Sequence, residues 1–178
     1  MRLEKVSLRS EIESLARTLG QRALAHAAVC ATAESCTAGG AAWAVTSAAG
    51  SSAWFDRGFV TYTNASKVEM LGVSQATLAA HGAVSVQTAA EMALGVLAHA
   101  PLATVAASIT GIAGPGGAVP GKPVGTVCFG FARRTASGAP VVETVVEHFS
   151  GDRELVRLQS VRRALQGLIA AVSAKAPD

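Results

Sequence analysis

Ser35 is the residue of this chain whose position best fits chemistry. It stands in the run Ala33-Glu34-Ser35-Cys36-Thr37-Ala38-Gly39-Gly40, between the strand-like segment Val29 to Thr32 and the small residues of a predicted helix start. Free N–H groups from Thr37 to Gly40 and the positive end of a helix would stabilise an anion beside this hydroxyl. The run predicts either an attacking serine with its oxyanion site or a loop that cradles phosphate, while a simple helix cap fits the local residues equally.

A serine hydroxyl attacks poorly unless a base removes its proton, and the sequence shows no Asp/His pattern that would serve Ser35. Tyr62, the only tyrosine, and Lys67 stand five positions apart at the end of a predicted strand. Each would tune the proton affinity of the other, and either one with a lowered pKa is an available base. An ordinary packing role for both is the alternative. Cys36 is a second candidate nucleophile, because a thiol at a helix start has a lowered pKa.

The segments that must position these side chains alternate between helical and extended patterns. Apolar residues recur at helical spacing near both ends of the chain, and runs of small or β-branched residues between them predict strands. The predicted helices are Leu3 to Ala27, Ala38 to Ala48, Ala65 to Leu71, Ser74 to Ala80, Val86 to His99 and Asp152 to Val172. The predicted strands are Ala28 to Thr32, Gly58 to Thr63, Ala103 to Ile109, Gly125 to Arg133 and Val141 to Phe149, the last two joined around Ser137-Gly138.

This alternation predicts a three-layer α/β/α domain with a mixed, mostly parallel sheet of about five strands, since the last two strands can pair antiparallel. We expect a single domain over the 178 residues, with its core at about residues 15–170. Loops that follow the carboxyl ends of strands gather on one edge of such a sheet. The Ser35 turn, Tyr62 and the Gly- and Pro-rich loop from Thr110 to Gly117 should therefore face one crevice.

Composition and charge narrow the classes of function. The formal net charge is +3 and basic residues mix with acidic ones at both ends, so no basic stripe indicates nucleic-acid binding. No stretch is continuously apolar over the roughly 20 residues that cross a bilayer, which argues against a membrane protein. The first residues lack a signal-peptide pattern, so we expect a cytoplasmic protein. Charged residues are sparse from residue 23 to 151, which favours subunit contacts in a homo-oligomer.

The cysteines and histidines form no metal or disulfide pattern. Cys30, Cys36 and Cys128 contain no CxxC pair, and the four histidines are scattered along the chain. We therefore expect no metal site and no disulfide framework.

Several ordered segments carry a resemblance to a known family. They are Ala33-Glu34-Ser35-Cys36-Thr37, Gly50-Ser51-Ser52-Ala53-Trp54-Phe55, Gly58-Phe59-Val60-Thr61-Tyr62, His81-Gly82-Ala83-Val84-Ser85, Thr110-Gly111-Ile112-Ala113-Gly114-Pro115, Lys122-Pro123-Val124-Gly125-Thr126-Val127 and Gly151-Asp152-Arg153. With them the chain resembles the CinA carboxyl-terminal domain family from about Leu15 to Leu168. It looks like the stand-alone form, without the larger amino-terminal domain of some members.

The resemblance implies an activity. Members of the family act as nicotinamide-nucleotide amidases, which hydrolyse the carboxamide of nicotinamide mononucleotide to nicotinate mononucleotide and ammonia. It also implies Ser35 as the nucleophile, Tyr62 and Lys67 as its activating pair, and no metal or organic cofactor. A catalytically silent nucleotide-binding or protein-interaction module of the same fold is the alternative.

The implied substrate points to further residues. N–H groups around Thr37, Ala38 and Gly39 would hold the developing oxyanion, although the family often has glycine where this chain has Ala38. The phosphate needs donors, for which Thr110, the loop amides including those of Gly111 and Gly114, and Arg153 are candidates. The alternative for Arg153 is a place on a solvated helix face.

Overall fold

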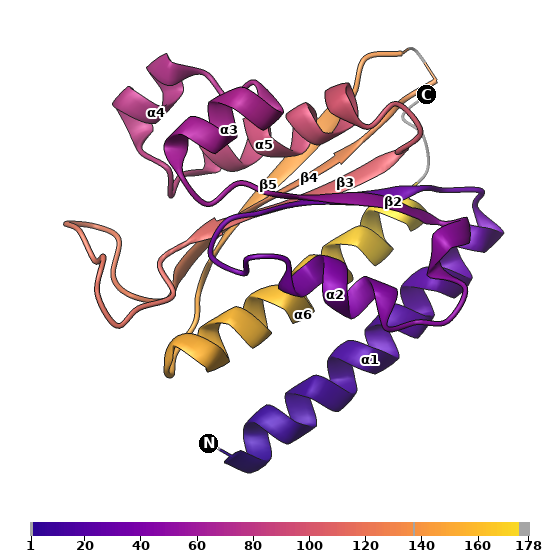
Figure 1. Cartoon of the computed structure of the whole chain (residues 1–178), viewed down its shortest axis with the longest axis horizontal. Helices are drawn as coiled ribbons and strands as arrows, with labels where there is room; N and C mark the ends of the chain where they lie inside the picture. Colours follow the sequence, from indigo (N-terminus) through magenta and orange to yellow (C-terminus); the bar gives the residue numbers. More distant parts are fainter. Residues whose placement is uncertain (1, 137, 175–178) are drawn as a thin grey trace.

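The computed structural model describes residues 2–136 and 138–174, in which helices and strands alternate as the sequence predicts (Figure 1). The helices are α1 (Arg2–Ala25), α2 (Gly40–Thr46), the 3-10 turn η1 (Ser51–Ala53), α3 (Asn64–Leu71), α4 (Gln75–His81), α5 (Val86–His99) and α6 (Arg153–Ser173). The strands are β1 (Cys30–Glu34), β2 (Phe55–Val60), β3 (Val105–Gly111), β4 (Thr126–Arg133) and β5 (Val141–His148).

The strands form one mixed sheet in the order β2-β1-β3-β4-β5. β1 pairs in parallel with both β2 and β3, whereas β4 runs antiparallel to β3 and to β5. Every described strand except β4 therefore points the same way, which confirms the predicted mixed, mostly parallel sheet. The carboxyl ends of β1, β2 and β3 meet at one edge, where parallel sheets present their functional loops.

Helices cover both faces of the sheet, with α3, α4 and α5 on one side and α1, α2 and α6 on the other (Figure 1). β1 is buried along its whole length, and β3 along all but its last residue, as expected of strands enclosed between two helical layers. Leu19, Val161, Leu165 and Leu168 lie in the core beneath the sheet. The helical stripes read from both ends of the chain thus face the core as predicted.

Several boundaries differ from the predictions, and three of them lie beside Ser35 and Tyr62. β1 extends to Glu34, because Ser35 N–H still donates to the Ile109 carbonyl at 2.9 Å. α2 begins at Gly40, since Ala38 and Gly39 have φ of 49° and 88°, outside the right-handed helix. β2 ends at Val60, before Tyr62. The predicted turn at Ser137-Gly138 includes Ser137, which lies outside the described residues.

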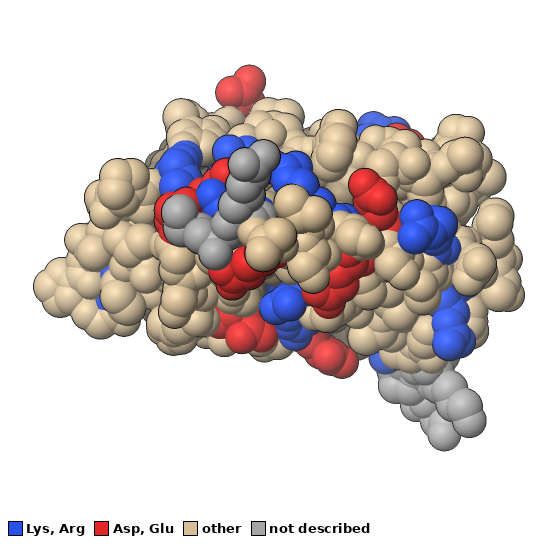
Figure 2. Space-filling view, turned by 90° about the horizontal axis from the view of Figure 1, so that it is seen from below, with Lys and Arg blue, Asp and Glu red and all other residues tan. Residues whose placement is uncertain are grey.

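The outer surface of α1 and α6 carries charges of both signs. Figure 2 shows acidic and basic side chains interspersed on the face seen from below, where these helices lie. Ion pairs join the two helices, among them Arg162 with Glu11 at 3.5 Å. Within the described ranges, no helix is both long enough and apolar enough to cross a membrane.

Candidate active site

The buried amine of Lys67 lies against the hydroxyl of Ser35. The Nζ atom of Lys67 is 3.2 Å from Oγ of Ser35, and it donates to the Thr61 carbonyl oxygen at 2.8 Å. Lys67 is only 1% exposed, and Ser35 is 9% exposed. A lysine this deeply buried needs a reason, because lysine is almost never fully buried without a partner.

The start of α3 explains how Lys67 reaches this position. Thr63 caps the helix, since its Oγ1 accepts from Ser66 N–H at 3.1 Å while Ser66 Oγ accepts from Thr63 N–H at 3.1 Å. This reciprocal capping box orients the first turn of α3. Lys67 follows directly in the same turn and points back across the end of β2 to the end of β1. A local capping signal thus aims a side chain at a residue distant in sequence.

Burial lowers the pKa of the Lys67 amine from its ordinary value of 10.5, because apolar surroundings disfavour the ammonium form. The charge of the nearby Cys36 thiolate would act in the opposite direction, with a smaller effect. A lysine with a lowered pKa holds a larger neutral fraction near neutral pH than an exposed one. Only the neutral amine can accept a proton from a serine hydroxyl.

A pocket of about 230 Å³ opens beside this pair at the carboxyl edge of the sheet. It is lined by Ser35, Cys36, Tyr62, Lys67, Ala83, Val84, Thr110, Gly111, Ala113 and Arg153. The lining comes from the ends of β1, β2 and β3, the loop after β3, the first turn of α3, the loop before α5 and the start of α6. The structure therefore brings Ser35, Tyr62, Lys67, Thr110, Gly111 and Arg153, which the sequence singled out, to one crevice.

Arg153 and Tyr62 meet at the mouth of the pocket. Arg153 Nη2 donates to the Tyr62 hydroxyl at 3.0 Å, and Nη1 donates to the Gly114 carbonyl at 2.8 Å. Tyr62 is 56% exposed. The Tyr62 hydroxyl accepts from Arg153, so these contacts do not support the mutual tuning of Tyr62 and Lys67 that their spacing suggested. Arg153 links the end of β2 to the Gly-rich loop and does not merely occupy a solvated helix face.

The Ser35 turn, residues 35–39, differs from the helix start that was predicted. Thr37 is 1% exposed and its side chain lines a separate pocket of about 330 Å³ between α1, α2 and α6. The Ala38 N–H donates to the Ser35 carbonyl at 3.1 Å. Within the part of the chain that the structure describes, the N–H groups of Cys36, Thr37 and Gly39 make no hydrogen bond to another residue. These backbone N–H groups are therefore left without an acceptor among the described residues, close to the Ser35 hydroxyl, which lines the pocket.

Ala38 occupies a position with left-handed backbone, at φ 49°. Glycine adopts this conformation without a steric penalty, whereas a Cβ atom makes it unfavourable. Glycine therefore suits this position best, and this chain accommodates alanine there at a cost in backbone strain.

Thr110 lines the pocket and also makes a hydrogen bond inside the protein. Its Oγ1 donates to the Ala83 carbonyl at 2.7 Å, so the hydroxyl proton is already engaged. Thr110 is 1% exposed at the end of β3. The contact joins the end of β3 to the loop before α5, and Thr110 and Ala83 both line the pocket.

Glu34 is a structural residue of the site for which the sequence reasoning gave no role. Its fully buried carboxylate accepts from Ala41 N–H at 2.9 Å, from Ala42 N–H at 2.8 Å and from the Thr32 hydroxyl at 3.4 Å. Glu34 thus satisfies the orphan N–H groups and the positive end of α2. The N–H groups of Ala41 and Ala42 are therefore already occupied by an internal carboxylate, and the N–H groups of the preceding Ser35 turn are not. The acidic residue directly before the Ser35 turn was the feature of the sequence that could have indicated this capping role.

We expect Glu34→Ala to lower the free energy of unfolding by about 2–4 kcal/mol, because buried N–H groups at the start of α2 would lose their acceptor. Thermal unfolding followed by circular dichroism measures this as a clear fall in Tm. Glu34→Gln keeps one acceptor oxygen and should lose less stability. Equal melting of Glu34→Ala and the parent chain would contradict the capping role.

Cys36 adjoins Ser35 but lies in an environment that keeps its thiol protonated. Burial, reinforced by the charge of Glu34, raises the pKa of Cys36 to about 12, against smaller opposing effects from its own backbone N–H and from Arg157 and Arg153. The lowered pKa expected for a thiol at a helix start is therefore wrong here, because α2 begins later and desolvation dominates. Cys36 is thereby disfavoured as the nucleophile.

The described residues contain no group of three or more His, Cys, Asp and Glu side chains arranged to hold a metal ion. Cys30, Cys36 and Cys128 are buried free thiols.

Comparisons with known proteins find relatives over most of the chain. The family model described as CinA C-terminal domain matches residues 12–172. The nicotinamide-nucleotide amidohydrolase PncC of Escherichia coli K12 is 52% identical over 159 residues, covering 89% of this chain and 93% of the relative. The protein of the same name from Enterobacter agglomerans is 60% identical over 134 residues, covering 75% and 79%. The crystal structure of a competence/damage-inducible protein from Agrobacterium tumefaciens superposes with a TM-score of 0.82 at 46% identity, covering 90% and 95%.

Proposed function

The chain belongs to the CinA C-terminal domain family, and from this premise we propose that it is a nicotinamide-nucleotide amidase with a serine nucleophile. Its substrate in this proposal is nicotinamide mononucleotide, and its products are nicotinate mononucleotide and ammonia. The names of the amidohydrolase relatives support the substrate and the reaction. The contact between Ser35 and the buried amine of Lys67, at 3.2 Å, is the observation that carries the serine mechanism.

In the proposed first step, neutral Lys67 accepts the proton of Ser35 as Oγ attacks the carboxamide carbon. The tetrahedral intermediate carries its negative charge on the former carbonyl oxygen, and free N–H groups of the Ser35 turn would stabilise it. One such donor contributes about 3 kcal/mol of transition-state stabilisation. When the intermediate collapses, the C–N bond breaks, the Lys67 ammonium gives its proton to the leaving nitrogen, and ammonia departs.

The second half of the reaction repeats the same proton transfers with water. Neutral Lys67 takes a proton from a water molecule that attacks the acyl-enzyme, and the ester bond to Ser35 then breaks. The proton returns to Oγ, which regenerates the enzyme and releases the carboxylate. Lys67 thus acts as base and then as acid in each half, while Tyr62 belongs to the mouth of the pocket in this scheme.

We propose that Arg153 binds the phosphate of the substrate. The pocket volume of about 230 Å³ lies below the roughly 300–1,000 Å³ typical of ligand sites, so part of a mononucleotide must extend past the mouth. Arg153 stands there with its guanidinium between Tyr62 and the Gly114 carbonyl. Amides of the loop around Gly111 to Gly117 would complete the phosphate site.

Arg153→Met should raise KM for nicotinamide mononucleotide about 10- to 100-fold with a small change in kcat, because a charge-assisted contact to the phosphate is lost. Steady-state ammonia release measures both constants. Nicotinamide riboside, which lacks the phosphate, is the control substrate, and its KM should stay close to that of the parent enzyme. A similar rise in KM for both substrates would contradict phosphate binding by Arg153.

Ammonia release from nicotinamide mononucleotide by the purified chain tests the function itself. Stoichiometric conversion to nicotinate mononucleotide supports the amidase, and tight binding without release would favour a silent nucleotide-binding module of the same fold. One domain over the whole chain, residence in the cytoplasm and assembly into a homo-oligomer stay predictions from the sequence. Exposed Trp43 and Leu102, at 65% and 69%, are compatible with subunit contacts.

A further inference from the structure

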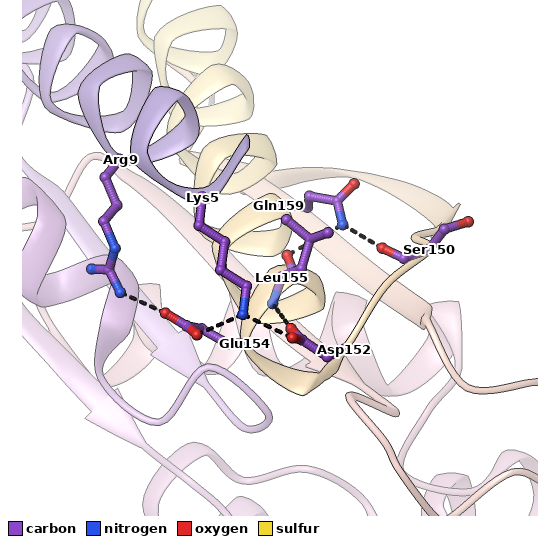
Figure 3. Close-up of polar contacts among 7 residues, drawn as sticks. All are labelled: Lys5, Arg9, Ser150, Asp152, Glu154, Leu155 and Gln159. Atoms are coloured by element: carbon purple, nitrogen blue, oxygen red, sulfur yellow. Dashed lines mark hydrogen bonds and ion pairs between the residues drawn. The ribbon is translucent and has the colours of Figure 1, made fainter. Parts of the chain in front are cut away.

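Asp152 and Glu154 flank Arg153 in the sequence, and both form ion pairs with basic side chains of α1. Lys5 Nζ lies 2.8 Å from Asp152 Oδ2 and 2.7 Å from Glu154 Oε2, and Arg9 Nη2 lies 2.8 Å from Glu154 Oε1 (Figure 3). Figure 3 shows both carboxylates turned toward α1, from which Lys5 and Arg9 project. Arg153 instead turns to the pocket mouth, where its guanidinium contacts other residues.

The charges in this cluster are well matched. Hydrogen bonds from Lys5 lower the pKa of Asp152 and of Glu154, so both carboxylates are ionised at neutral pH. The Lys5 side chain is only 16% exposed, and the same hydrogen bonds raise its pKa. Lys5, Arg9, Asp152 and Glu154 together carry no net charge. Within the described residues Arg153 makes no ion pair of its own, and its guanidinium donates to the Tyr62 hydroxyl and the Gly114 carbonyl.

We propose that Lys5 and Arg9 neutralise the two carboxylates beside Arg153 and so keep its guanidinium available to an anionic group of the substrate. Without them, an incoming phosphate would meet two negative charges next to the single arginine that is to bind it. Like charges at such distances oppose binding, and the Arg153 side chain would have competing partners in its own neighbourhood. The inference rests on the proposed function, because it assigns the anion to the amidase substrate.

This role gives α1 a purpose beyond packing. The family match begins at residue 12, so Lys5 and Arg9 lie upstream of the matched region. Asp152 also caps α6, since its Oδ1 accepts from Leu155 N–H at 2.9 Å. Lys5 therefore contacts the first turn of α6, which carries Arg153, through both Asp152 and Glu154. Lys5 is a positioning residue, because it acts on the substrate only through the surroundings of Arg153.

The central test is Lys5→Met, which keeps most of the length of the side chain and removes its charge. We expect KM for nicotinamide mononucleotide to rise about 3- to 10-fold, with kcat and the KM for nicotinamide riboside little changed. The effect should shrink as salt is added, because screening weakens repulsion between the carboxylates and the phosphate. Lys5→Arg keeps the charge and should stay close to the parent enzyme.

A second substitution separates charge from geometry. Glu154→Gln in the Lys5→Met background restores the net charge around Arg153 and should recover most of the lost affinity. Glu11→Gln is the matched control, since it breaks the Glu11–Arg162 pair, another ion pair between α1 and α6 that does not involve the neighbours of Arg153. It should leave the ratio of the two KM values unchanged.

Two results would overturn the proposal: an equal rise in KM for both substrates, or no recovery in the double variant. The affinity for ribose 5-phosphate, measured by calorimetry, needs no turnover. It therefore distinguishes failure of the charge proposal from failure of the amidase assignment. Weaker binding to Lys5→Met by a chain that releases no ammonia would refute the amidase and support the charge arrangement. Normal ammonia release by the parent chain, with unchanged binding of ribose 5-phosphate to Lys5→Met, would support the amidase and refute the charge arrangement.

Discussion

Ser35→Ala is expected to lower kcat for ammonia release from nicotinamide mononucleotide by at least about 10³-fold, because it removes the atom that forms the acyl-enzyme. Ser35 is small and 9% exposed, so losing one hydroxyl should leave the fold intact. An unchanged Tm and retained binding of nicotinamide mononucleotide would show that the loss is chemical. Release of ammonia is measured with an enzyme-coupled assay over a long incubation, so that residual rates of this size are detected.

Cys36→Ala is the matched control for this experiment. It removes a single side-chain atom from the adjacent residue, as Ser35→Ala does from Ser35. Burial raises the pKa of the Cys36 thiol to about 12. We expect it to keep most of the activity. Activity that survives in Ser35→Ala and disappears in Cys36→Ala would refute the serine mechanism and transfer the role to the thiol.

Lys67→Met is expected to lower kcat about 10²- to 10⁴-fold, the range associated with losing a general base. The methionine side chain fills much of the same buried volume without an amine, so the fold should persist. Lys67→Arg tests charge separately, because a guanidinium stays protonated and cannot accept the proton of Ser35. Full activity in either variant would exclude Lys67 as the base.

The pH profile supplies an independent readout of the same residue. Burial lowers the pKa of Lys67 below 10.5, and the amine is a base only when neutral. Activity of the parent enzyme should therefore rise as pH increases through this lowered pKa and level off above it. The residual activity of Lys67→Met should lack that rising limb. An identical limb in both proteins would assign the titration to another group.

Much of the fold could be predicted because its signals are local. Ser85 and Ser74 cap α5 and α4 where turn-favouring residues precede helical patterns, and the bounds of α5 agree with the prediction. The predicted start of α2 is wrong because the backbone conformation of the preceding turn overrides the helical pattern of the sequence. Ala38 has a high intrinsic helix propensity, yet it adopts left-handed backbone in the turn before α2. Its neighbours in sequence give no sign of this.

The candidate site divides in the same way. The residue types, the turn after a strand and the Gly-rich loop identified Ser35, Tyr62 and Lys67 as groups that share one sheet edge, because strand direction decides where loops gather. Arg153 entered only as a candidate phosphate donor that the family resemblance suggested. The same reasoning left Tyr62 and Lys67 equal as partners of Ser35. It also gave Cys36 the properties of an exposed helix start.

By itself, the sequence determined which segments become helices and strands, the mixed sheet and the set of side chains at its carboxyl edge, since periodicity and turn chemistry act over a few residues. Only the tertiary structure decided that Lys67 and not Tyr62 reaches Ser35, that Glu34 occupies the end of α2, and that Lys5 stands against Asp152. These pairings depend on how distant elements pack. The pKa directions of Lys67 and Cys36 follow from the same packing, because desolvation is set by everything that surrounds a group and not by its neighbours in sequence.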